Sequence, residues 1–147
     1  MFKRILCATD GSKRSTHAVR TAAALAHGSG ALLTLVHVTP DYRSPYYPDG
    51  VMIDRPSVKD YKRDCKAAAE KVFAKDLATA SKEGAEAETL HLFGDSPADE
   101  LLAAAKKGKA DLIVRASHGR KGFEALLLGS ETQKVLARTA VPVLVVR

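Results

Sequence analysis

The stretch that decides the fold is residues 110–130, Ala-Asp-Leu-Ile-Val-Arg-Ala-Ser-His-Gly-Arg-Lys-Gly-Phe-Glu-Ala-Leu-Leu-Leu-Gly-Ser. It opens with the apolar run Leu112–Val114, whose length and β-branched content are typical of a buried strand. A polar loop with glycines follows, and a helical pattern begins at residues 129–130. Glycine lets a backbone approach a ligand closely, and a helix N-terminus presents unpaired N–H groups to an anion. The stretch therefore predicts a strand, a phosphate-binding loop and a helix.

On both sides of this stretch, strand and helix patterns alternate. Apolar runs predict strands, with a weaker alternating run at 85–93 that suits a sheet edge; the five ranges are 3–8, 31–38, 85–93, 110–115 and 141–146. Helical spacing covers 15–27, 57–83, 97–108 and 130–138. A strand–helix–strand order implies right-handed βαβ units with parallel strands. The chain is therefore predicted to be an α/β protein with a doubly wound sheet, in which ligands sit beyond the carboxyl ends of the strands at the topological switch point.

Local signals mark where each helix begins or ends. Gly28 is expected to end the first helix, and Ser57 and Ser96 each begin a capping box that is completed three residues later. Residues 130–133, Ser-Glu-Thr-Gln, form another such box, which predicts Ser130 as the N-cap of the last helix. On the second helix, the apolar residues at 61, 65, 68, 72, 77 and 80 predict the buried face.

Composition excludes several classes of protein. The formal net charge is +6, from 23 Lys and Arg against 17 Asp and Glu, but along 59–76 basic residues alternate with acidic ones, including Asp76. This is typical of a solvated helix face, so no nucleic-acid partner is expected. No apolar run approaches the roughly 20 residues of a membrane span, and no signal peptide is evident. We therefore expect a cytoplasmic protein. Cys7 and Cys65 lack metal-type spacing and are interpreted as buried thiols.

Residues 39–56 interrupt the pattern with four prolines and three tyrosines. This composition suits either a variable surface loop or an excursion that forms a lid or a subunit contact. The sequence leaves both alternatives open.

Several motifs together resemble the universal stress protein family. Residues 117–119, Ser-His-Gly, the nine-residue interval before Gly129-Ser130, and the closing segment 141–147 resemble its C-terminal signature. Asp10 resembles part of its opening motif, and residues 36–38 resemble its second strand. The resemblance covers essentially the whole chain, so residues 1–147 are expected to form one domain. It implies a three-layer, five-stranded parallel sheet of order 3-2-1-4-5, of the adenine nucleotide alpha hydrolase-like or flavodoxin-like type.

The resemblance also implies a ligand and its binding residues. The family's nucleotide-binding branch carries Gly-x2-Gly-x9-Gly-Ser/Thr and binds ATP, with Mg or Mn held by the phosphates. Carried over to this chain, the nucleotide-binding residues are Ala8, Asp10, Val38, Arg115, Ala116, Gly119, Gly129, Ser130 and Glu131. Asp10 would accept hydrogen bonds from ribose or adenine, or would only anchor the turn after the first strand. Ala8 and Val38 would contact the nucleotide, or would only be core residues.

Two positions depart from the motif. Ala116 stands where the family has its first glycine, and Arg115 precedes it where a small or apolar residue is usual. Arg115 either donates to a phosphate or fills the base pocket. Two functions follow from these alternatives: an ATP-binding switch in stress signalling, or a homodimeric interaction protein that has lost the nucleotide. In both, homodimerisation through the C-terminal strand is implied by the family.

Catalysis is not expected from these residues. Ser117 and His118 are adjacent, whereas the members of a hydrolase triad usually come from separated segments. No catalytic base for attack on a γ-phosphate is evident, so ATP hydrolysis would be slow at most. A flavodoxin-like enzyme would rest on fold analogy alone.

Overall fold

The computed structural model describes residues 1–43, 49, 50, 52, 54–118 and 127–147 of the chain. Strands and helices alternate along it, in the order β1 (Arg4–Ala8), α1 (Lys13–Ser29), β2 (Leu32–Thr39), α2 (Val58–Lys82), β3 (Ala87–Phe93), α3 (Pro97–Lys107), β4 (Leu112–Ala116), α4 (Ser130–Arg138) and β5 (Val143–Val146). The predicted α/β class and element order are confirmed.

The five strands form a single parallel sheet in the order β3-β2-β1-β4-β5. The predicted doubly wound order is therefore confirmed, and β3 lies at an edge, as its alternating sequence indicated. The order reverses at β1, which pairs with β2 on one side and with β4 on the other, with Cys7 opposite Val114. The carboxyl ends of β1 and β4 therefore meet at the topological switch point.

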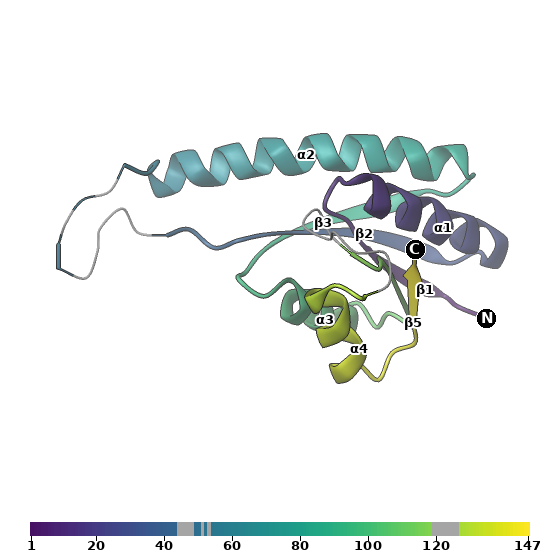
Figure 1. Cartoon of the computed structure of the whole chain (residues 1–147). Coiled ribbons are helices and arrows are strands. Elements are labelled where there is room, and N and C mark those ends of the chain that lie inside the picture. The colour runs from purple at the N-terminus through teal and green to yellow at the C-terminus, as the bar shows by residue number, and fades with distance from the viewer. Residues whose placement is uncertain (44–48, 51, 53, 119–126) are drawn as a thin grey trace.

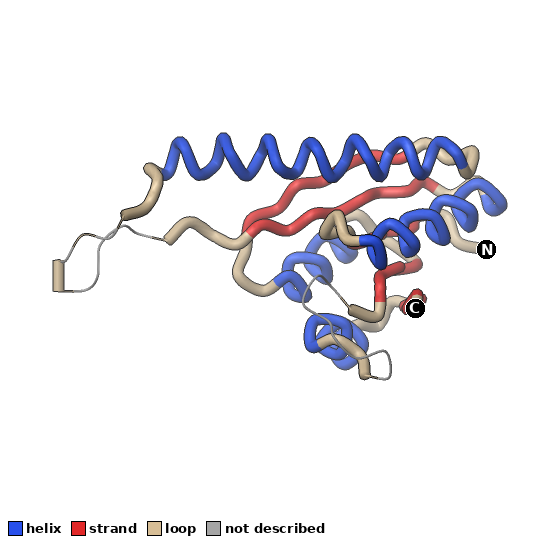
Figure 2. The backbone as a smooth tube through the Cα atoms, turned by 45° about the horizontal axis from the view of Figure 1, so that its top comes forward, coloured by secondary structure: helices blue, strands red, loops and turns tan. Residues whose placement is uncertain are grey.

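Helices cover both faces of the sheet, so the molecule has three layers. Helices α1 and α2 lie on one face, and α3 and α4 lie on the other (Figures 1 and 2). Successive residues of one strand point to opposite faces, and two buried clusters result. Cys7, Leu35 and Val114 pack on the α1 side, whereas Leu6 and Ile113 pack on the α3 side.

The buried face of α2 differs from the predicted one. Its buried residues are Ala69, Phe73, Asp76 and Ala80, whose spacing of three and four is that of one helix face. Leu77, predicted to face inward, is exposed, and Asp76, taken for a solvated charge, is fully buried. The predicted buried face was wrong because it was chosen from apolar residues alone, whereas the buried face of α2 includes the Asp76 carboxylate.

Helix ends are partly as predicted. Ser57 and Ser96 are the N-caps of α2 and α3 and accept hydrogen bonds from the N–H groups three residues on. Helix α1 runs through Gly28 and is instead capped by Gly30, whose φ of 67° suits the left-handed cap position. The predicted N-cap Ser130 is wrong, because Gly129 occupies that position in α4.

Within the described residues, no helix is long and apolar enough to cross a bilayer. Both cysteines are free thiols, Cys7 fully buried and Cys65 half-buried. The burial predicted for Cys7 is therefore confirmed, and that for Cys65 is only partial.

Candidate functional site

The switch point brings together four segments that are distant in sequence. Asp10 follows the end of β1, Ser117 follows the end of β4, and Gly129 is the N-cap of α4. Val38 lies near the carboxyl end of the neighbouring strand β2. Ala8 and Val38 are partly buried and pack against the cluster on the α3 side of the sheet. Gly119, which the motif also names, lies outside the described residues.

Asp10 shapes the turn between β1 and α1. Its Oδ1 accepts a hydrogen bond from the Ser12 N–H at 2.9 Å. Gly11, between them, has a φ of 77°, a left-handed conformation that glycine adopts without strain. Ser12 is the N-cap of α1, and its side chain accepts from the Ser15 N–H. The half-buried Asp10 carboxylate is thus held at a fixed place above the sheet.

Arg115 links β4 to the start of α4. Its Nη1 donates to the backbone oxygen of Glu131 at 3.3 Å, and its buried Nε makes no hydrogen bond within the described part of the chain. Burial lowers the pKa of the guanidinium, although the Glu131 and Asp10 carboxylates oppose this. Arg115 is therefore a largely desolvated cation with two carboxylates in electrostatic range.

The backbone between β4 and α4 is closely packed where the described residues resume. Gly129 N–H donates to the Ser117 oxygen at 2.8 Å. A Cβ on Gly129 would lie 3.2 Å from that oxygen, so close approach and not φ, which is −59°, favours glycine here. Thr132, fully buried, donates to the backbone oxygens of Ala116 and Ser117. Thr132 is not among the predicted site residues, because the sequence marks it only as an interior position of the capping-box pattern at 130–133.

No side chain among the described residues caps the N-terminus of α4. Ser130 is exposed, is the first residue of the helix and makes no side-chain hydrogen bond to described residues, while Gln133 reaches back to the Leu128 oxygen instead. The Glu131 carboxylate is engaged elsewhere: it accepts from the Ala98 N–H at 2.8 Å, at the start of α3, and from Lys134. Burial by itself raises the pKa of the Glu131 carboxyl group. The hydrogen bonds from Lys134 and from the Ala98 N–H together outweigh this effect, so the pKa is lowered overall.

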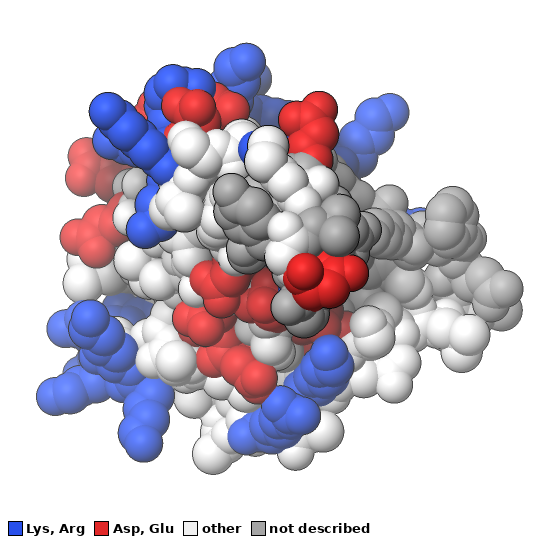
Figure 3. Space-filling view, turned by 90° about the vertical axis from the view of Figure 1, so that its left-hand side faces the viewer, with Lys and Arg blue, Asp and Glu red and all other residues white. Residues whose placement is uncertain are grey.

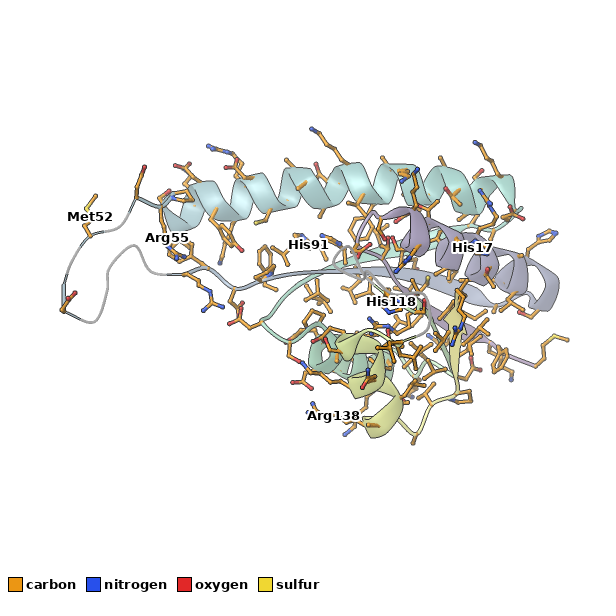
Figure 4. The ribbon with its side chains drawn as sticks, in the orientation of Figure 1. His17, Met52, Arg55, His91, His118 and Arg138 are labelled. Carbon is orange, nitrogen blue, oxygen red and sulfur yellow. The ribbon has the colours of Figure 1, made fainter. Side chains whose placement is uncertain are left out.

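Ser117 and His118 are both buried, and Ser117 Oγ lies 3.3 Å from His118 Nδ1. Figure 4 shows His118 inside the molecule, whereas His17 lies on the outer side of α1. The adjacent pair does make contact, which the sequence interpretation did not expect. Among the residues with described placement, however, His118 bonds to no carboxylate that would orient it as a catalytic base.

Carboxylates gather at the carboxyl edge of the sheet. Asp10, Asp41 and Asp95 each follow a strand by two residues, and Asp95 accepts from the Asp41 N–H and pairs with Arg43. Figure 3 faces this edge and shows acidic side chains near its middle, with Lys and Arg toward the margins. No cluster among the residues placed in the structure has three metal-binding side chains.

A cavity of about 360 Å³ lies at the opposite, amino-terminal end of the strands. Arg4, Leu32, Leu90 and Lys107 are among the residues that line it, and it contains none of the predicted site residues. This cavity and the motif residues are thus at opposite ends of the sheet.

The sequence model of the Universal stress protein family matches residues 1–147. The chain belongs to this family. It is 38% identical to a universal stress protein of Thermus aquaticus, encoded in the QAH/OAS sulfhydrylase 3′ region, over 100% of both chains. It is 32% identical to the universal stress protein YxiE of Bacillus subtilis, again over 100% of both.

Solved universal stress protein structures share the fold. Universal stress protein UspA from Lactobacillus plantarum superposes with a TM-score of 0.81 at 23% identity, over 99% of this chain and 97% of that one. A universal stress protein in complex with cAMP gives 0.71 at 26% identity, over 99% and 97%. One from Archaeoglobus fulgidus in complex with dAMP gives 0.70 at 23% identity, over 100% and 98%.

Proposed function

We propose that this universal stress protein binds an adenine nucleotide, ATP in particular, at the carboxyl edge between β1 and β4, and acts as a switch in stress signalling in the cytoplasm. The observation that carries the proposal is the amino end of α4. It starts at the switch point, has no side-chain cap from the described residues and exposes the Ser130 hydroxyl. Free N–H groups and a hydroxyl at a helix N-terminus suit a phosphate.

The other motif residues suit the remaining parts of the nucleotide. Ala8 and Val38 offer apolar contact to the adenine, and Asp10 offers an acceptor to ribose or to the adenine amine. Gly129 and Ala116 let backbone approach the phosphates, with Gly119 completing the loop, and Glu131 contributes its backbone N–H because its carboxylate is bound to α3. Arg115 supplies a desolvated positive charge beside the α4 N-terminus.

The ligand class is supported by relatives of the same fold. The structure with cAMP, at 26% identity, binds an adenine nucleotide. In ATP the added phosphates would carry Mg or Mn, because the described residues offer no metal cluster of their own. The described residues include no oriented catalytic base, and in this proposal hydrolysis is slow at most and occupancy rather than turnover is the signal.

Isothermal titration of nucleotide-free protein with ATP and Mg²⁺ tests this function. We expect micromolar binding that is lost in Asp10→Ala and strengthened or unchanged in Ala116→Gly. Glu70→Ala, on the exposed side of α2, is the matched control and should bind as the unaltered protein does. No heat of binding from a folded protein would reject the proposal.

A second function is favoured by Arg115 itself. Because its guanidinium is held at Glu131 and is largely desolvated, it would fill the crevice in a protein that binds no nucleotide. The protein would then act as a homodimeric interaction protein, joined through β5, which lies at the sheet edge with half-buried residues. Light scattering at micromolar concentration should show a dimer in either case, and Arg115→Ala should create ATP binding only in this second one.

A further inference from the structure

Asp76 is an unusual residue for the buried face of a long helix. Its side chain is 0% exposed, and its Oδ2 accepts a hydrogen bond from the Thr9 hydroxyl at 2.5 Å. Its Oδ1 has no hydrogen-bond partner within the described residues. A buried carboxylate with an unpartnered oxygen costs stability, and apolar replacements of such groups are often neutral or stabilising. Its presence in α2 therefore calls for a role other than holding the fold together.

The partner of Asp76 stands next to the candidate nucleotide site. Thr9 directly precedes Asp10, and its backbone joins several elements: its N–H donates to the Val36 oxygen, and its own oxygen lies 2.9 Å from His37 Nδ1. Its hydroxyl lies 3.3 Å from Ser15 Oγ and accepts from the Gly11 N–H at 3.3 Å. Thr9 thus joins α1, β2 and the turn after β1.

Helix α2 holds this turn at two adjacent positions. Lys75 Nζ reaches the Gly11 oxygen at 3.4 Å, while Asp76 holds the Thr9 hydroxyl. Because the proton of that hydroxyl is directed to Asp76, its lone pairs remain for the Gly11 N–H. The carboxylate therefore sets the hydroxyl orientation on which the backbone conformation before and after Asp10 depends.

We propose that Asp76 is a positioning residue for the nucleotide site, acting through Thr9 to fix the turn that presents Asp10. This rests on the proposed function, since Asp10 is taken to contact the nucleotide. The buried carboxylate lowers the stability of the fold, but it keeps the Asp10 acceptor in place before the nucleotide binds. Binding then does not have to order the turn, and affinity is higher.

The test measures ATP–Mg²⁺ affinity and the free energy of unfolding on the same variants. Asp76→Ala removes the acceptor, and affinity should fall roughly 2- to 30-fold, the range of positioning effects through packed networks. The free energy of unfolding should be unchanged or higher. Asp76→Asn keeps an acceptor oxygen for Thr9 and should bind as the unaltered protein does, as should Glu70→Ala, which removes an exposed carboxylate from the same helix.

If Asp76 only stabilised the fold, Asp76→Ala would lower both the free energy of unfolding and the ATP affinity, and that result would overturn the proposal. Unchanged ATP affinity in Asp76→Ala would overturn it as well. If the unaltered protein binds no nucleotide, the proposed function fails, and hydrogen exchange of the Gly11 and Ser12 amides decides about Asp76 separately. Faster exchange of both amides in Asp76→Ala upholds its control of the turn, and unchanged exchange refutes it.

Discussion

Replacing Thr9 by valine should destabilise the protein far more than removing the Asp76 carboxylate, to which the Thr9 hydroxyl donates a hydrogen bond. Valine has nearly the shape of threonine, so packing at the end of β1 is kept and only the hydroxyl is lost. In Thr9→Val, Asp76 loses its one hydrogen bond to a described residue and stays buried with neither oxygen satisfied. In Asp76→Ala, the costly group itself is gone.

The size of the effect follows from the Asp76 contact. A hydrogen bond to a charged group contributes about 1.5–3 kcal/mol, and leaving the charged partner buried makes the upper part of that range apply. We expect Thr9→Val to lower the free energy of unfolding by about 2–3 kcal/mol. For a chain of this length this corresponds to roughly 4–12 °C in Tm. The double variant with Asp76→Ala should recover most of the loss, because the stranded carboxylate is absent.

Urea unfolding at pH 7.5, followed by circular dichroism, measures these free energies, and equal slopes across variants would support two-state comparison. Thr9→Ser is the control, since it keeps the hydroxyl and loses only a methyl group. A loss below about 0.5 kcal/mol in Thr9→Val, within the range of ordinary surface substitutions, would show that the contact with Asp76 is not the one the structure describes.

Three further outcomes can be checked on the same protein. Burial raises the pKa of Asp76 despite the hydrogen bond from Thr9. The stabilisation from protonated Asp76 is therefore complete below the ordinary pKa of aspartate and is lost as the pH rises through the raised pKa. In urea titrations between pH 4 and 8, the free energy of unfolding of Asp76→Asn should lack this decline. Gly129→Ala should cost about 1–3 kcal/mol from crowding against Ser117, whereas Ser130→Ala should cost less than about 0.5 kcal/mol because Ser130 is not the cap; equal losses would contradict the assigned cap. Burial raises the pKa of the Cys7 thiol, so it should react with a disulfide reagent only at the rate of unfolding, and rapid labelling of Cys7 in folded protein would contradict its burial.

The sheet could be predicted because its signals are local and redundant. Four of the strands are short, mainly apolar runs, and the caps at Ser57 and Ser96 lie where the sequence placed them. The strand order came from the family resemblance and not from periodicity. The alternation of β3 indicated an edge on its own, because one side of an edge strand stays partly wet.

The site could be predicted only in outline. The motif identifies the residues that converge at the switch point, but the use of each side chain depends on neighbours that are distant in sequence. The carboxylate of Glu131 is bound to the N-terminus of α3, and Gly129 takes the cap position because it packs on Ser117. The sequence predicts Asp76 to be a surface charge, because a charged residue among lysines is usually solvated. Its hydrogen-bond partner, the Thr9 hydroxyl, is distant in sequence, so the residues around Asp76 do not indicate its burial.

The most direct test of the central claim is to map where ATP binds, by following backbone amide signals in NMR as ATP and Mg²⁺ are added. We predict that shifts concentrate at the carboxyl edge, at residues 9–11, 116–118 and 129–131. The amides of Leu32, Leu90 and Lys107, around the cavity at the amino-terminal end of the strands, should stay unchanged. Shifts confined to that cavity, or no shifts at millimolar nucleotide, would contradict a nucleotide site between β1 and β4.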